Sequence, residues 1–417
     1  MKKIISLILL VCCMAALCGC ETVEKVSEID LPPVPTAGIA AEAEQTPEPQ
    51  NTVTETQHQH IIIQSETTEL EAYDPQQGTE LILSFSYATP YVHIPGNISA
   101  EENINEFIAM LNESYYTGDT YGVVYDSGCA PGYINMLTMA EDNYNYIVNS
   151  AINFEGGLTP LDCHRWFTVP RIDDSVLSLK FYDYLSMADG QEKIAYKCYN
   201  FDARTGELLT LDSLSDDSEA MKALISSDIQ ESEGREFDIA LTEGNWYFSN
   251  RGLDIVTESE VLDDKVPNVN GTWEYSVSYP ELAEHLKSEY IPAEITDTAS
   301  FSVVPAEALS ESSKEIIDML KFHDEGQALY LVVDGQANNV CISRVDYTDH
   351  FYVTERLWFC SVMEDCALQL VTDIPEGMPE LKLSYTDAEG EHELYLSQSG
   401  EDGSLLLVDG SSIEAVG

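Results

Sequence analysis

The stretch "YNFDARTGELLTLDSL", residues 199–214, sets two runs of apolar residues around a short polar turn. Asp202 opens this turn, and Gly206 is available for the left-handed backbone conformation that the turn requires. Acidic residues follow, and beyond them Met221 and Ile225 recur at the spacing of one helix face. The sequence here predicts a β-hairpin that leads directly into an amphipathic helix.

The residues upstream of this stretch carry the same mixture of strands and helices. Apolar residues alternate through residues 80–96 as they do in a strand with one buried face. Ser99 and Glu102 then form a capping box ahead of a helical pattern. Residues 144–154 and 175–186 are typical of successive strands, so we expect β structure to dominate this region.

The two segments downstream, "GNWYFSNRGLDIV" (residues 244–256) and "GTWEYSVSYPELAEHLK" (residues 271–287), predict a second hairpin and a strand that runs into a short helix. Taken with the turn from Asn200 to Gly206, they resemble the extracytoplasmic domain of the RsiV anti-sigma factor. The same domain family occurs beside peptidoglycan deacetylases and alone in exported lipoproteins. Residues 86–108 are similar to the module that usually precedes it.

The resemblance implies a domain over residues 77–295 with an α+β fold, in which helices pack on an antiparallel sheet. It also implies a noncatalytic domain that binds other molecules outside the cell, as the RsiV member recognises lysozyme. Two features depart from the family. Residues 187–202 lack the histidine of the Gly-Gly-Ala-His loop that commonly precedes the turn, and Lys3 leads directly into an apolar segment, so we expect no anti-sigma role.

The N-terminus has the layout of a secretory signal peptide over residues 1–20. Two lysines precede an apolar run from Ile4 to Leu17, and this run is too short to cross a membrane as a helix. The last four residues, Leu17-Cys18-Gly19-Cys20, resemble the lipobox of bacterial lipoproteins, in which the final cysteine is diacylated. By this resemblance Cys20 anchors the mature protein to the cell membrane, where acyl chains contribute about 0.8 kcal/mol per buried methylene.

Residues 21–76 are rich in Pro, Thr, Glu and Ala and poor in aromatic residues. Such a composition does not bury enough apolar surface to fold, so we predict a disordered acidic tether. His58 and His60 lie two apart within it, but no further ligands accompany them and we predict no metal site.

The charge of the chain limits its partners. The 19 basic residues face 74 acidic ones, which gives a formal net charge of −55 and excludes nucleic acid as a ligand. The acidic surface could recruit a cationic protein such as lysozyme, because a field of one sign accelerates encounter with the opposite sign. Alternatively, it serves solubility alone.

Six cysteines follow the signal peptide, and exported chains can form disulfides. Their pairing is open, with up to three bridges, and the alternative is that several are small buried hydrophobic residues. The adjacent pair of Cys163 and a histidine does not indicate a thiol nucleophile, because neighbours in sequence rarely face each other productively. The candidates are Cys129, Cys163, Cys198, Cys341, Cys360 and Cys366.

The C-terminal part of the chain changes character. Residues 296–325 are a connector, in which Ser312 and Glu315 cap a predicted short helix over residues 316–320. Residues 326–417 contain seven short apolar and aromatic runs separated by Gly, Asp and Pro turns. This pattern predicts a small all-β domain, a sandwich or a barrel.

No catalytic, metal or cofactor motif occurs in the sequence. Four aromatic residues could form a surface that binds a sugar or a peptide, although alternation on strands favours core packing for them: Trp246, Tyr247, Trp273 and Tyr275. We therefore predict an exported lipid-anchored lipoprotein that binds or senses a cell-wall component or a cationic protein without catalysis and needs no cofactor. The alternatives are a peptidoglycan- or polysaccharide-modifying enzyme, or its accessory subunit, and a structural surface protein.

Overall fold

A computed structural model describes most of the chain after the predicted tether. The described residues are 60–117, 132–149, 159–186, 192–233, 241–242, 244–258, 272–309, 314–347, 350–373, 378–399 and 404–410. Contacts group residues Thr56–Gly417 into one compact unit. The predicted signal peptide, Cys20 and most of the predicted tether lie outside the described residues. Within those residues, no helix is both long enough and apolar enough to span a membrane.

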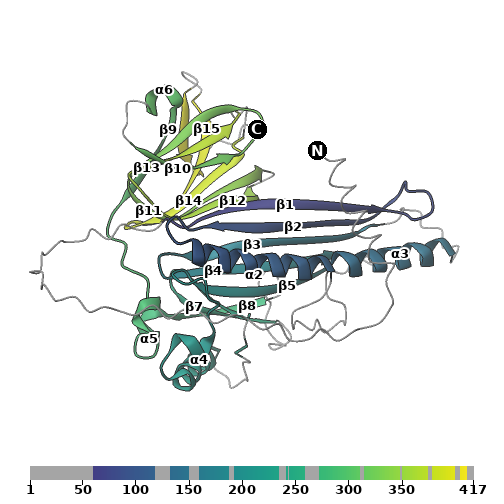
Figure 1. Cartoon of the computed structure of the whole chain (residues 1–417), viewed down its shortest axis with the longest axis horizontal. Coiled ribbons are helices and arrows are strands. Elements are labelled where there is room, and N and C mark those ends of the chain that lie inside the picture. The colour runs from purple at the N-terminus through teal and green to yellow at the C-terminus, as the bar shows by residue number, and fades with distance from the viewer. Residues whose placement is uncertain are drawn as a thin grey trace, which may run out of the picture. The chain divides into compact units, whose positions relative to one another are not determined.

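The described unit is an α+β structure dominated by one large sheet, which confirms the predicted fold class (Figure 1). The two long helices are α2 (Ile98–Thr117) and α3 (Tyr133–Asn149). The main path of the sheet runs through β16 (Leu405–Asp409), β15 (Gly390–Gln398), β14 (Leu381–Asp387), β11 (Gln327–Tyr347), β12 (Phe351–Glu364), β1 (Ile62–Tyr73), β2 (Leu81–His93), β3 (Leu161–Ile172), β4 (Val176–Ser186) and β5 (Glu192–Asp202). Strands β2 and β3 are parallel, because α2 and α3 connect them; the predicted purely antiparallel sheet is therefore mixed.

The prediction of a disordered tether up to residue 76 is wrong at its C-terminal end. Strand β1 occupies that segment and lies in the middle of the sheet between β2 and β12. Its first residues belong to the run "HIII", whose three isoleucines are at most 2% exposed. Ile62 packs in the C-terminal core, while Ile61 and Ile63 pack in the core beneath α2. The side chains of this short apolar run pack on both faces of the sheet. The run was missed because the amino-acid composition of residues 21–76 as a whole is dominated by the polar residues around it.

Helix α2 confirms the predicted helix after residue 99, with a different cap. Asn97 accepts a hydrogen bond from the backbone N–H of Ala100, and Glu101 accepts one from the N–H of Ile94. The buried face of the helix carries Ile104 and Ile108, which pack on the sheet. Asparagine thus fills the capping role that the sequence assigned to Ser99.

Two other predicted elements are wrong. Residues 144–149, expected as a strand, end helix α3, because Met136, Ala140 and Tyr144 bury one helical face against β2. Residues 316–320, expected as a helix, lie within strand β10 (Glu315–Lys321), which pairs in parallel with β13 (Cys366–Thr372). In both segments tertiary pairing outweighs the local signal.

The C-terminal region is all β, as predicted, and β11 is the strand that organises it. Its first half pairs with β13 and with β9 (Ala299–Pro305), and its second half pairs with β12 and β14. Gly335 lies where the partners change, with a φ of 84°, and a Cβ there would lie 2.1 Å from the carbonyl oxygen of Thr298. The strand can turn there because glycine occupies the position.

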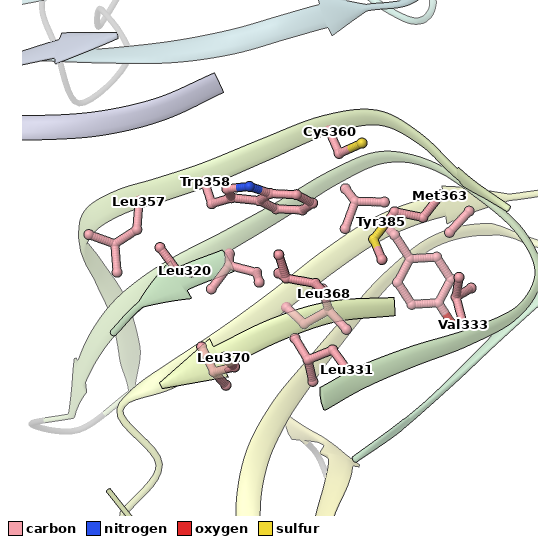
Figure 2. Close-up of a cluster of buried hydrophobic side chains, with 14 of the residues drawn as sticks. Leu320, Leu331, Val333, Leu357, Trp358, Cys360, Met363, Leu368, Leu370 and Tyr385 are labelled. Atoms are coloured by element: carbon pink, nitrogen blue, oxygen red, sulfur yellow. The ribbon is translucent and has the colours of Figure 1, made fainter. Parts of the chain in front are cut away.

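The core of this region is a large apolar cluster around Trp358, which is fully buried. Figure 2 shows its indole above leucines 368 and 370, with Tyr385 and Met363 at one side. The only indole N–H in this cluster donates to Asp318, which also accepts from Gln64 of β1. The cluster thus ties β10 and β12 to the N-terminal strand.

A smaller sheet of three strands carries the second predicted hairpin. It consists of β6 (Trp246–Phe248), β7 (Gly252–Glu258) and β8 (Thr272–Ser278). The hairpin and the strand into a short helix are confirmed. Helix α4 (Ser218–Glu233) lies near them in the chain, together with the short helices η1 (Leu211–Leu214), α5 (Tyr279–Leu282), η3 (Ser288–Tyr290) and, farther along, α6 (Ala306–Leu309).

Candidate functional site

The aromatic residues proposed as a ligand surface are core residues. Trp246 is 1% exposed, Tyr247 7% and Tyr275 8%, and all three pack inside clusters around the small sheet. The side chain of Trp273 lies outside the described residues. Core packing, the alternative that the sequence favoured, is therefore confirmed for these three residues, and they form no surface platform.

The five described cysteines are free thiols: Cys163, Cys198, Cys341, Cys360 and Cys366. Burial raises the pKa of the Cys163 and Cys198 thiols to about 12 and that of Cys366 to about 11. Thiols with such pKa values are poor nucleophiles at neutral pH, so these residues act as small hydrophobic residues. Cys129 lies outside the described residues.

The turn that carries the family resemblance is a structural junction. Asn200 joins the two sheets: its amide donates to the carbonyl of Trp246, and its oxygen accepts from the N–H of Phe248 and from Ser178. Gly206 has a φ of 73°, and a Cβ there would lie 2.5 Å from the carbonyl oxygen of Ala100 in α2. The turn is confirmed, although its second run forms only one bridge to β5 before η1.

Arg171 and Asp202 extend this junction on the side of the short helices. Arg171 is 1% exposed and donates to Asp173, to the hydroxyl of Tyr279 and to the carbonyl of Tyr290. Burial alone would raise the pKa of Asp202, but bonds from Arg204 outweigh it and lower that pKa. We refer to Arg171, Asn200, Asp202 and Gly206 together as the junction. Each polar atom named here has a partner within the protein.

A cleft of about 310 Å³ lies where β12 diverges from β1. β1 and β12 pair only from Ile62 to Gln64, so residues beyond that point separate and leave a hollow between the strands. The cleft is lined by Ser65, Thr67, Ser86, Ala88, His164, Arg165, Trp166, Phe167, Val353, Thr354, Glu355 and Arg356. No residue predicted as a site from the sequence lines it.

A chain of hydrogen bonds along β2 and β3 fixes the imidazole of the cleft. Ser86 and His164 are paired in register, and the serine Oγ lies 2.6 Å from His164 Nδ1. His164 Nε2 lies 2.9 Å from Asp162. A carboxylate accepts only, so Nε2 carries a proton, and in the neutral ring Nδ1 then accepts from the serine hydroxyl. The arrangement holds one tautomer and one ring orientation.

A row of stacked aromatic rings extends from the cleft along the same face of the sheet. The rings of Trp166 and Tyr182 lie 5.2 Å apart and are nearly parallel, and His164 stacks on Tyr184 at 6.0 Å. All four side chains are partly exposed. They come from β3 and β4 at alternating positions, so they form a row on one face. Lys180 closes the row, with its ammonium 5.0 Å from the Tyr182 ring.

The opposite wall of the cleft carries charge. Glu355 accepts from Thr67 at 2.8 Å and lies 3.6 Å from Arg344. Arg356 follows it on β12. The side-chain oxygen of Ser65 is shielded from solvent and has no hydrogen-bond partner in the described part of the chain. The cleft thus contains hydrogen-bond donors and acceptors that are not used in hydrogen bonds within the described part of the protein.

The chemistry of this arrangement favours recognition. Ser86 lies in a strand that is paired on both sides, so its main-chain N–H is used in the sheet and does not form an oxyanion hole. Cys163 and His164 point to opposite faces of β3, with the thiol buried in the core beneath the helices. The described residues contain no group of three or more His, Cys, Asp or Glu that would hold a metal.

Alternation in the sequence carried a signal for this site. Asp162, His164 and Trp166 recur at every second position, as do Tyr182 and Tyr184, which places each set on one face of a strand. What the sequence did not show is the pairing of β2 with β3, which brings Ser86 beside His164 across 78 residues of chain.

No protein-family model matches the sequence, and no curated protein is found to be similar to it. Solved structures similar to part of this chain include two DUF3298 family proteins. A DUF3298 family member from Bacteroides fragilis aligns with a TM-score of 0.40 and 14% identity over 55% of this chain and 94% of that one. A DUF3298 family protein from Pseudomonas aeruginosa aligns with a TM-score of 0.34 and 12% identity over 55% of this chain and 96% of that one.

Proposed function

We propose that the protein is an exported, lipid-anchored binding protein that engages a component of the cell wall without catalysis. The observation that carries the proposal is the cleft with its row of stacked aromatic rings. Aromatic rings offer a flat apolar surface for the apolar face of a sugar, and a few convergent polar groups fix orientation. The cleft joins both elements on one face of the sheet.

Anchoring is the second part of the proposal and is supported by the lipobox-like run that ends at Cys20. Metabolic labelling with a palmitate analogue in a bacterial host tests it. We expect label on the wild-type protein and none on Cys20→Ala. Label that persists on the variant would contradict anchoring through this cysteine.

Calorimetric titration of residues Thr56–Gly417 with soluble peptidoglycan fragments tests the binding function. We expect saturable binding that Trp166→Ala weakens about tenfold or more, since stacking on an aromatic ring contributes on the order of 1–3 kcal/mol in related aromatic sites. Tyr352→Ala is the matched control, because Tyr352 is 40% exposed and does not line the cleft. Equal losses in both variants would place the ligand elsewhere.

A cationic protein such as lysozyme is the alternative partner, and the net charge of −55 favours it. Binding of this kind falls steeply as salt rises, because screening weakens charge attraction. We expect lysozyme to bind at low salt with little dependence on Trp166. The absence of binding to either ligand would support a structural surface protein.

A wall-modifying enzyme is the second candidate function, favoured by the hydrogen bonds from Ser86 through His164 to Asp162. A serine activated in this way reacts with fluorophosphonates, since the imidazole removes the hydroxyl proton during attack. Covalent labelling of wild-type protein that is lost in Ser86→Ala but kept in Ser84→Ala would support catalysis. No labelling supports binding alone.

A further inference from the structure

We propose that the cleft contains an anion subsite formed by Arg356 and Ser65, so that its ligand carries a carboxylate. This inference rests on the proposed binding function and names the chemical class of the ligand. A glycopeptide of the cell wall, in which carboxylates accompany sugar rings, has the required chemistry.

The first observation is that most of the few basic side chains in this protein already have an acidic partner. Acidic residues outnumber basic ones by 74 to 19, and most described lysines and arginines are engaged. Those in ion pairs are Arg165, Arg171, Lys180, Arg204, Lys222, Arg251, Lys314, Arg344 and Lys382.

Arg356 differs from these residues. It lines the cleft and is partly buried, yet its guanidinium has neither a hydrogen bond nor an ion pair among the described residues. The carboxylate next to it in sequence, Glu355, is already engaged by Thr67 and faces Arg344. A guanidinium carries five donors, so a partly buried one without acceptors favours an anion.

The second observation is independent of charge. The hydroxyl oxygen of Ser65, on the β1 side of the cleft, is buried and has no hydrogen-bond partner within the described chain. Leaving a buried hydroxyl unpaired costs about 1–3 kcal/mol, which a ligand that accepts a hydrogen bond from this hydroxyl would recover. Arg356 and Ser65 thus supply a charged and a neutral donor from opposite walls of one cleft.

The net negative charge of the protein does not prevent such binding. At physiological salt the Debye length is about 8 Å, so charges on distant surfaces are largely screened. The donors in the cleft act over hydrogen-bond distances. The same field weakens binding of an anion at low salt, which opposes the local attraction by Arg356.

The test compares one ligand in two charge states. A purified muropeptide with free carboxylates and the same muropeptide with those carboxylates amidated are titrated calorimetrically into residues Thr56–Gly417. We expect the carboxylate form to bind about 10- to 100-fold more tightly. The preference should fall to less than about threefold in Arg356→Gln and should shrink by a smaller factor in Ser65→Ala.

Lys321→Gln is the matched control, because Lys321 also makes no hydrogen bond or ion pair among the described residues but is exposed on β10 and does not line the cleft. It should leave the preference unchanged, and thermal melts of all variants check the fold. Equal affinity of the wild type for both forms would overturn the anion subsite while leaving the binding function intact. Binding of neither form would overturn both.

Discussion

The junction and the cleft both place polar side chains between strands, but the two regions differ in whether those side chains have hydrogen-bond partners within the protein. At the junction, Asn200 makes three hydrogen bonds to the protein and Arg171 donates to four different groups. In the cleft, Ser65 has a buried hydroxyl without a partner in the described chain. The contrast separates polar groups that hold the fold together from polar groups that remain available to a ligand.

The same contrast predicts which substitutions unfold the protein. Gly206→Val should have the largest effect, because the left-handed φ disfavours a β-branched residue and the side chain would collide with Ala100 of α2. We expect a loss of about 3 kcal/mol or more in the free energy of unfolding, measured by urea denaturation. Gly78→Val is the control: its φ is also positive, but nothing lies within 4 Å of a Cβ there. Equal losses would show that backbone strain alone is responsible.

Asn200→Ala comes next. It leaves the carbonyl of Trp246 and the N–H of Phe248 without their side-chain partner between two sheets. We expect a loss of about 2–4 kcal/mol in the same assay. Asn103→Ala, which removes one exposed bond to the turn, should cost less than about 1 kcal/mol. A small effect at Asn200 would mean that the two sheets do not depend on this bridge.

Acid should weaken the junction more than the cleft. The folded-state pKa of Asp202 is lowered, so its contribution to stability is present above the unfolded-state pKa of about 3.9 and is lost as pH falls through the folded value. We expect the melting temperature of wild type to fall below about pH 4 more steeply than that of Asp202→Asn. Parallel curves for the two proteins would contradict this role for Asp202.

His164→Ala should have the smallest effect on stability. His164 and Asp162 are both more than a third exposed, and exposed pairs of this kind contribute less than about 1 kcal/mol. We expect an unfolding free energy within about 0.5 kcal/mol of wild type together with weakened muropeptide binding. A large loss of stability with unchanged binding would assign His164 to the fold rather than to the cleft.

The sequence predicted the fold class, the turn at Gly206 and the hairpin around β6 and β7, because each rests on local signals such as glycine placement and alternation. It did not predict β1, because the three isoleucines at its start, residues 61–63, are too few to alter the composition of the acidic region around them. The cleft was also beyond local reasoning. It exists because β2 pairs with β3 and because β12 leaves β1, and both are contacts between segments far apart in the chain.

The pairing of β1 with β12 has a consequence for the order of folding. The backbone N–H of Ile61 donates to Ser361, 300 residues later, so β1 cannot complete its pairing until most of the chain has been synthesised. The pairing of β1 with β2 can form early, but its pairing with β12 joins segments far apart in the chain, and contacts at such separation are slow to form. During that interval the edge of β1 that later pairs with β12 is open to mispairing, and a chaperone that shields extended apolar peptides would act there.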